Sequence, residues 1–199
     1  RRFPFIPPWP EYSGMIGDFR RERTGDKGRM VLPVGYSLKT GYVRGVDITA
    51  GGSVIVSGNN GSGANLLFEE IVMSLADLFG MKEGDYLAID NPREFLSDLD
   101  NCRLISKEPG RLKIVLFDSD KDTDLLVSEA GRMLLSGEQG IHLGIGAANH
   151  RILDFSDLGY ACLSTKLPEG YGFMKTNLCK HTIRIRIPGM GKEEDDDND

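Results

Sequence analysis

Residues 53–65 read Ser-Val-Ile-Val-Ser-Gly-Asn-Asn-Gly-Ser-Gly-Ala-Asn, and this segment is the strongest indication of the fold. The β-branched run Ser53–Ser57 predicts a buried parallel strand. Within 66–79 the apolar residues recur at helical spacing, as Leu67, Ile71, Leu75 and Leu78. Gly80 is suited to end that helix in a left-handed conformation. A strand, a glycine-rich loop and a helix in this order form the setting of a phosphate-binding loop.

The loop matches the glycine frame of G-x-x-x-x-G-K-[ST] but lacks its reactive side chains. Ala64 and Asn65 stand where a lysine and a hydroxyl residue belong. In the complete motif the lysine reaches the β- and γ-phosphates and the hydroxyl holds Mg²⁺. An anion could still bind at the helix N-terminus, but phosphoryl transfer would lose much of its charge stabilisation. We interpret the loop as a relic nucleotide-binding site, with a structural glycine turn as the alternative. Its residues are Gly58, Asn59, Asn60, Gly61, Ser62, Gly63, Ala64 and Asn65.

A second candidate position ends the most strand-like segment of the chain. Residues 112–118 read Leu-Lys-Ile-Val-Leu-Phe-Asp, which resembles a Walker B strand whose acid, here Asp118, holds Mg²⁺. Active hydrolases usually place a carboxylate next, whereas this chain has Ser119. The alternative is a solvated Asp-Ser-Asp turn that caps a helix beginning at Asp124.

A third candidate position follows a strand predicted over 141–147. In P-loop ATPases a polar sensor residue at this strand end contacts the γ-phosphate, and Asn149 could fill that role. A loop asparagine is also a common turn residue. We expect the neighbouring His150 to lie on the surface.

The remaining segments also alternate between strand and helix patterns. Met30–Tyr36 and Tyr42–Ile48 predict antiparallel strands joined by a turn at 39–41. Further strands are expected at 86–90, 104–106, 160–164, 171–175 and 182–187, with helices after Pro92 and over 124–135. The predicted fold class is α/β, a three-layer P-loop NTPase (RecA-like) fold with a mostly parallel central sheet and an added antiparallel β-hairpin.

Composition divides the chain into three parts. Residues 1–29 are rich in proline and glycine and are expected to be a loose entry segment or linker, with an extended strap at 1–10. Residues 30–188 form the predicted domain, and 189–199 an acidic disordered tail. Residues 192–199 contribute −5 of the formal net charge of −6, so the rest is close to neutral. The alternative for this tail is an acidic docking segment.

Several classes of function find no support in the composition. No apolar run approaches the ~20 residues needed to span a bilayer, and the absence of an initial Met suggests a piece of a longer protein. Cys102, Cys162 and Cys179 lie far apart, without metal-ligand spacing to any histidine. We therefore predict no metal site and no catalytic residue within this chain.

Together these features resemble an FtsK/SpoIIIE-type ATPase domain. They are most similar to the C-terminal, degenerate ATPase domain of the EssC/EccC family of type VII secretion membrane proteins. The resemblance rests on the hairpin at 30–48, the loop at 57–65, the strand ending at Asp118, the sensor-like stretch 140–149, and 170–174 with the final strand.

The resemblance implies a membrane-anchored parent with a string of cytoplasmic ATPase domains that forms hexamers. Its expected partners are the upstream ATPase domains and secreted proteins, at the cytoplasmic face of the cell membrane. The departures at Ala64, Asn65 and Ser119 put ATP hydrolysis and tight Mg-ATP binding in doubt. The predicted function is therefore a pseudo-ATPase module for substrate recognition, assembly or regulation.

Two other functions remain open from the sequence. One is a weak ATP-binding or ATPase domain that a neighbouring domain or subunit completes. The other is a DNA translocase segment, which the near-neutral body disfavours because nucleic acid binding depends on a basic surface.

Overall fold

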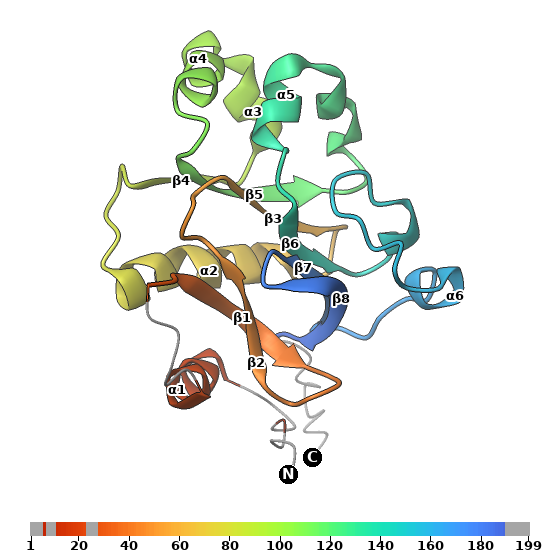
Figure 1. Cartoon of the computed structure of the whole chain (residues 1–199). Helices are drawn as coiled ribbons and strands as arrows, with labels where there is room; N and C mark the ends of the chain where they lie inside the picture. The colour runs from red at the N-terminus through yellow and green to blue at the C-terminus, as the bar shows by residue number, and fades with distance from the viewer. Residues whose placement is uncertain (1–5, 7–10, 23–27, 190–199) are drawn as a thin grey trace, which may run out of the picture.

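The computed structural model describes residue 6, residues 11–22 and residues 28–189, which form an α/β structure around an eight-stranded mixed sheet (Figure 1). The strands are β1 (Val31–Ser37), β2 (Val43–Asp47), β3 (Ser53–Gly58), β4 (Tyr86–Ile89), β5 (Leu112–Asp118), β6 (Gln139–Leu143), β7 (Tyr171–Thr176) and β8 (Cys179–Arg186). The helical elements are α1 (Tyr12–Glu22), α2 (Ala64–Phe79), α3 (Pro92–Ser97), α4 (Leu99–Lys107), η1 (Asp122–Val127), α5 (Glu129–Leu134), η2 (Ala147–Asn149) and α6 (Tyr160–Leu163). The strand order is β2-β1-β8-β7-β6-β3-β5-β4.

Four strands form the parallel half of the sheet, in the order β6-β3-β5-β4. Residues 54–56 of β3 are completely buried, as predicted for a parallel strand flanked on both sides. The register pairs Gly58 with Asp118 of β5 and with Leu143 of β6. The carboxyl ends of three strands therefore meet beside the glycine-rich loop.

The other half, β2-β1-β8-β7, pairs antiparallel, and β7 also joins β6 antiparallel. The predicted hairpin is confirmed as β1 and β2, and the predicted strands at 171–175 and 182–187 are confirmed as β7 and β8. The prediction of a mostly parallel sheet is wrong for the sheet as a whole. The antiparallel strands do not form a separate hairpin, because β1 pairs with β8 and so continues the same sheet.

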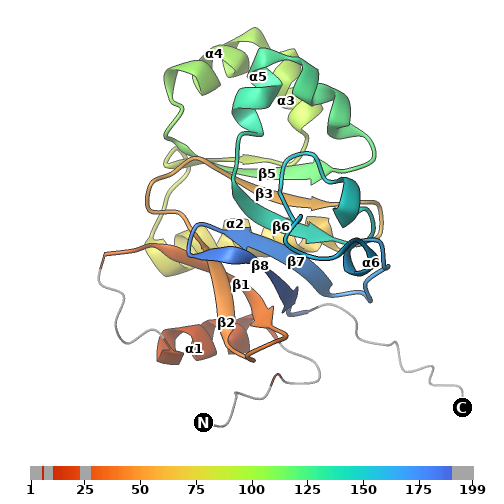
Figure 2. The same ribbon diagram turned by 45° about the vertical axis from the view of Figure 1, so that its right-hand side comes forward.

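Helices cover both faces of the sheet. Alternation along β3 sends Val54 and Val56 into a core with α2, and sends Ile55 into a second core with α3, α4 and α5. Both views show α2 on one side of the sheet and the group α3, α4 and α5 on the other (Figures 1 and 2). The helix pattern predicted for α2 is confirmed, since Leu67, Ile71 and Leu75 are completely buried.

Two predicted strands are helical instead. Residues 104–106 lie in α4, which begins where the Asp98 carboxylate accepts a hydrogen bond from the Asp100 N–H at 2.8 Å. Residues 160–164 contain the short helix α6, whose Tyr160 is exposed rather than packed against a sheet. These short apolar runs did not distinguish strand from helix, because period alone is ambiguous over three to five residues.

Two longer predictions were correct only in part. The helix predicted over 124–135 is interrupted at Ser128, which is extended and accepts a hydrogen bond from the Gly131 N–H at 2.9 Å, so it caps α5. The strand predicted over 141–147 ends at Leu143. Gly144 and Gly146 follow with φ values of +88° and +97°, which lie outside the range of a regular strand.

Residues 12–22 form α1, where the sequence analysis expected a loose segment. Met15 is completely buried against Tyr36 and Val43, and the Glu22 carboxylate accepts a hydrogen bond from the Val43 N–H at 3.0 Å. The proposed strap at 1–10 and the tail at 190–199 lie outside the described residues, apart from Ile6. Within the described ranges, none of the helices combines the length and the apolar composition that a membrane crossing requires.

Truncation of Ile71 to alanine should lower the free energy of unfolding by about 2–5 kcal/mol, because it leaves a cavity between α2 and the sheet. The matched control is Met73→Ala on the same helix. Met73 is 55% exposed, so its truncation should change that free energy by less than about 0.5 kcal/mol. Urea unfolding of the full chain measures both, and equal losses would contradict the assignment of Ile71 to the core.

Candidate functional site

A cleft of about 570 Å³ opens at the carboxyl ends of the parallel strands. The loop between β3 and α2 forms one wall, and the segments after β4 and β5 form the other. Ligands of open α/β sheets bind at this end of the strands. The structure thus brings the predicted loop and Asp118 together. The lining residues comprise 58–66, 90–93, 116–118, 121–122 and Glu169.

The glycines of the loop have specific structural roles. A Cβ atom at Gly58 would lie 2.1 Å from the Ser62 hydroxyl, so any side chain at this position would clash with Ser62. Gly61 and Gly63 have φ values of +76° and +84°, which side chains rarely adopt. The Ser62 N–H donates to the Asn59 carbonyl at 3.0 Å. The loop therefore keeps a tight glycine-dependent turn directly before α2.

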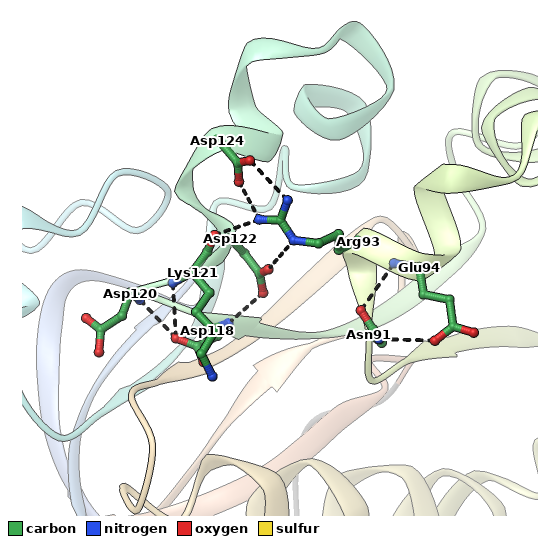
Figure 3. A network of polar contacts seen from close by, with 8 residues as sticks. All are labelled: Asn91, Arg93, Glu94, Asp118, Asp120, Lys121, Asp122 and Asp124. Atoms are coloured by element: carbon green, nitrogen blue, oxygen red, sulfur yellow. Dashed lines mark hydrogen bonds and ion pairs between the residues drawn. The ribbon is translucent and has the colours of Figure 1, made fainter.

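Asp118 lies beside this loop, and its carboxylate already has partners (Figure 3). Its Oδ1 accepts hydrogen bonds from the N–H groups of Asp120 at 3.0 Å and Lys121 at 3.3 Å. Its Oδ2 lies 3.1 Å from the Lys121 Nζ. Partial burial raises the pKa of the Asp118 carboxyl, but the bonds from Lys121 and the Asp120 amide outweigh it, so the pKa lies below its usual value. The turn of the alternative interpretation is thus present, but it does not cap a helix at Asp124, because η1 begins at Asp122 without a side-chain cap.

Arg93 of α3 connects the segment after β4 to the segment after β5 through hydrogen bonds and ion pairs (Figure 3). Its guanidinium forms paired bonds of 2.6 and 3.0 Å to the Asp124 carboxylate and donates to the Lys121 carbonyl at 2.7 Å. Its Nε lies 3.8 Å from Asp122, whose carboxylate accepts the Asp118 N–H at 3.0 Å. Sequence analysis missed Arg93, because nothing in the local pattern relates it to residues about 30 positions later.

The sensor-like stretch reaches the loop through a different residue from the one predicted. Asn149 is exposed in η2 and is not part of the described cleft lining. Gly144 packs against the loop instead, since a Cβ there would lie 2.3 Å from the Asn59 side-chain oxygen. The sensor role of Asn149 stays a prediction.

The prediction that His150 lies on the surface is wrong. Its Nε2 lies 2.8 Å from the Ser57 Oγ, directly before the glycine loop, and its Nδ1 accepts the Leu153 N–H at 2.9 Å. A neutral ring therefore carries its proton on Nε2 and donates it to Ser57. The Ser57 hydroxyl also lies 3.0 Å from Nδ1 of the completely buried His142, whose Nε2 donates to the Ile145 carbonyl. This polar cluster joins the base of the loop to the segment after β6.

Burial, with a smaller contribution from the neighbouring His142, lowers the pKa of His150 to about 3. Protonation would also break the acceptor contact at Nδ1, because a doubly protonated ring only donates. An unfolded chain takes up this proton near pH 6.5, whereas the folded chain resists it. The contribution of His150 to stability is therefore complete above that pH and is lost as the pH falls.

The cleft lining does not fit Mg²⁺ as it stands. Both oxygens of Asp118 are engaged, and Asn65 offers no hydroxyl at the position where the motif supplies one. Lys121, whose side chain is 73% exposed, would have to leave before a metal could reach Asp118. The described lining holds four carboxylates (Asp90, Asp118, Asp122 and Glu169) against two cations (Arg93 and Lys121). An anionic ligand without a counter-ion would meet net repulsion there.

Comparison with solved structures identifies similar folds. The cytoplasmic domain of EssC superposes with a TM-score of 0.63 at 12% identity, covering 93% of this chain and 48% of that one. The cytoplasmic domain of the type VII secretion ATPase EccC of Thermomonospora curvata gives 0.52 at 13% identity, covering 79% and 26%. The same EccC (ATPases 2 and 3), in complex with a signal sequence peptide, gives 0.55 at 11% identity, covering 92% and 44%.

This chain has the fold of the EssC and EccC ATPase domains. It spans less than half the length of each of these structures. No family model matches the chain. No curated protein matches it in sequence either. The resemblance noted from the sequence is thus supported at the level of fold.

His150→Gln should flatten the pH dependence of stability. Between pH 7.5 and 5 the unmodified chain should lose roughly 2 kcal/mol more unfolding free energy than this variant, as follows from a folded pKa of about 3. Urea unfolding at each pH measures the slope. The control is His181→Gln, since the His181 side chain is 83% exposed, and this variant should keep the slope of the unmodified chain. Parallel curves for the unmodified chain and His150→Gln would refute the assignment.

Proposed function

We propose that this chain is a pseudo-ATPase module of a type VII secretion motor, which acts in substrate recognition, assembly or regulation rather than in ATP hydrolysis. The observation that carries the proposal is the ion pair between Lys121 and Asp118, opposite a loop with Ala64 at the lysine position. The Lys121 ammonium is thus paired with the Asp118 carboxylate, which corresponds to the group that binds Mg²⁺ in a hydrolase. The cleft retains the shape of a nucleotide site and lacks the groups that neutralise a triphosphate.

A RecA-like nucleotide-hydrolase ancestry is part of the proposal. Two features support it: the loop follows β3, and Asp118 ends the adjacent parallel strand β5. The division into an entry segment at 1–29, a degenerate domain at 30–188 and an acidic tail at 189–199 also belongs to the proposal. The packing of α1 on β1 and β2 supports including residues 12–22 in the domain rather than in the entry segment.

The proposed partners follow from the similar structures. EccC has been solved as ATPases 2 and 3 with a signal sequence peptide, and this chain matches 44% of that structure. By analogy, this domain would contact preceding ATPase domains and secreted proteins in a membrane-anchored, hexameric parent. The outer face of α2 supports a docking role, because Leu66 and Met73 lie two turns apart and are each 55% exposed. Burial of such side chains is what stabilises protein interfaces.

A domain completed in trans remains the competing proposal. The excess of carboxylates in the described cleft lining favours completion in trans, because a lysine or arginine from a neighbouring domain or subunit would add the missing positive charge. It differs from the first proposal in requiring measurable affinity for nucleotide. DNA translocation finds no support in the charge of the chain, which is −6 overall.

Calorimetric titration of the full chain with ATP and Mg²⁺ separates these proposals. We expect no heat at millimolar nucleotide and no hydrolysis above background, because the cleft lacks charge compensation. Low-micromolar affinity would instead support completion in trans. Hydrolysis at rates typical of motors, abolished by Asp118→Ala, would refute the pseudo-ATPase proposal.

Restoring the motif should restore nucleotide binding. In the double variant Ala64→Lys, Asn65→Thr we expect ATP affinity to rise by at least roughly tenfold, because the lysine adds charge-assisted bonds to phosphate. Leu66→Lys is the matched control, since Leu66 also lines the cleft and the added charge is the same. An equal gain in the control would show a general charge effect and not a phosphate-binding geometry. Urea unfolding confirms that each variant is folded.

A further inference from the structure

A second groove, of about 550 Å³, lies between the β1–β2 turn and β8 on the antiparallel half of the sheet. Figures 1 and 2 show β1, β2 and β8 side by side, far from α3, α4 and α5. Its surface combines apolar side chains with cations. We define this basic groove by Leu38, Lys39, Arg44, Leu158, Ile183 and Arg184.

The cations of the basic groove lack carboxylate partners among the described residues. Lys39 and Arg184 are exposed, and no described carboxylate lies within ion-pair distance of either. Arg44 donates to the Val43 carbonyl at 3.3 Å and to the Thr40 hydroxyl at 3.4 Å, both neutral acceptors. No acidic residue belongs to the described lining of the groove. This is unusual in a chain whose net charge is −6.

The acids beside the groove are already engaged. Asp157 pairs with Lys175 at 3.0 Å and accepts the Thr182 N–H at 2.7 Å, and its pKa falls to about 2, since these bonds outweigh its partial burial. Glu22 accepts the Val43 N–H and keeps its negative charge near Arg44. The groove therefore presents the charges of Lys39 and Arg184, and that of Arg44 is partly offset by Glu22.

We propose that the acidic segment Glu193–Asp199 of this same chain docks in the basic groove. The segment carries six carboxylates within seven residues, opposite in sign to the groove. Oppositely charged surfaces attract over about 10 Å at 0.1 M salt. The apolar floor of Leu38, Leu158 and Ile183 excludes water around the pairs, which strengthens them.

The chain length fits this placement. The described part ends at Gly189, and β8 runs back from there along the groove. Residues 188–189 form a turn after β8, so Arg184 lies at most roughly 17 Å from Gly189 at ~3.4 Å per residue. A segment of ten residues in extended form reaches up to roughly 34 Å. The acids can therefore reach Arg184 and also Lys39, which follows Leu38, whose N–H donates to the Arg184 carbonyl at 2.9 Å.

The tether gives the segment a high effective concentration at the groove. This inference is independent of the nucleotide cleft, because the two regions share no lining residue.

Zero-length carbodiimide cross-linking of the full chain tests the proposal, because it joins a lysine amine to a carboxylate only at contact distance. Peptide mass spectrometry should find residues 193–199 joined to Lys39 and not to Lys82 or Lys107, which are equally exposed but lie elsewhere. The product should remain a monomer, with a yield unchanged over a roughly hundredfold dilution. Cross-links to all three lysines in equal yield, or a dimeric product, would overturn the proposal.

Arg184→Gln provides the second arm, since Arg184 cannot itself form the cross-link. We expect the Lys39 yield to fall roughly three- to fivefold on loss of one exposed charge pair. Arg103→Gln, the same charge change on α4, should leave the yield unaltered. High salt on the unmodified chain should reproduce the fall without any substitution. An unchanged yield in Arg184→Gln and in high salt would also overturn the proposal.

Discussion

The structure depends on the parallel pairing of β3 with β5 and β6 at the centre of the sheet. This pairing sets Gly58 beside Asp118 and Leu143. It also leads the Ser119 N–H to the Gly58 carbonyl at 3.1 Å, so the chain after β5 is anchored on the glycine loop. The loop, the aspartate and the segment after β6 consequently converge, although Asp118 and Leu143 follow Gly58 by 60 and 85 positions in the sequence. Any shift in this register would separate them.

The charges inside the cleft explain why the chain can have the fold of a nucleotide site without the groups needed for hydrolysis. The buried apolar residues of β3 and β5 fix the register, which brings the loop and the carboxylate to one edge of the sheet whatever polar side chains follow the strands. Hydrolysis requires more, namely cations placed on the phosphates and a carboxylate free for metal. Here Lys121 is paired with Asp118, and Arg93 is committed to Asp124 and the Lys121 carbonyl. The positive groups stabilise the protein itself.

Much of the fold was predictable because its elements are long or strongly patterned. β3, α2 and β5 follow from hydrophobic periodicity and lie within one or two residues of their expected bounds. The short segments 104–106 and 160–164 were assigned wrongly, since a few apolar residues fit either period. α1 was missed because Gly14 and Gly17 weaken its helical pattern, and its stability comes from packing of Met15 on Tyr36 and Val43.

Residue type and local spacing sufficed for β3, α2 and β5, the glycine loop, the missing lysine and hydroxyl, and the acidity of residues 193–199. Four features became apparent only in the folded chain. The sheet is mixed, Lys121 pairs with Asp118, His150 is partly buried against Ser57, and the described lining of the groove beside β8 lacks acidic residues. These features arise from contacts between segments that are distant in the sequence. The energies of these contacts depend on burial and on distance, and a local sequence pattern specifies neither quantity.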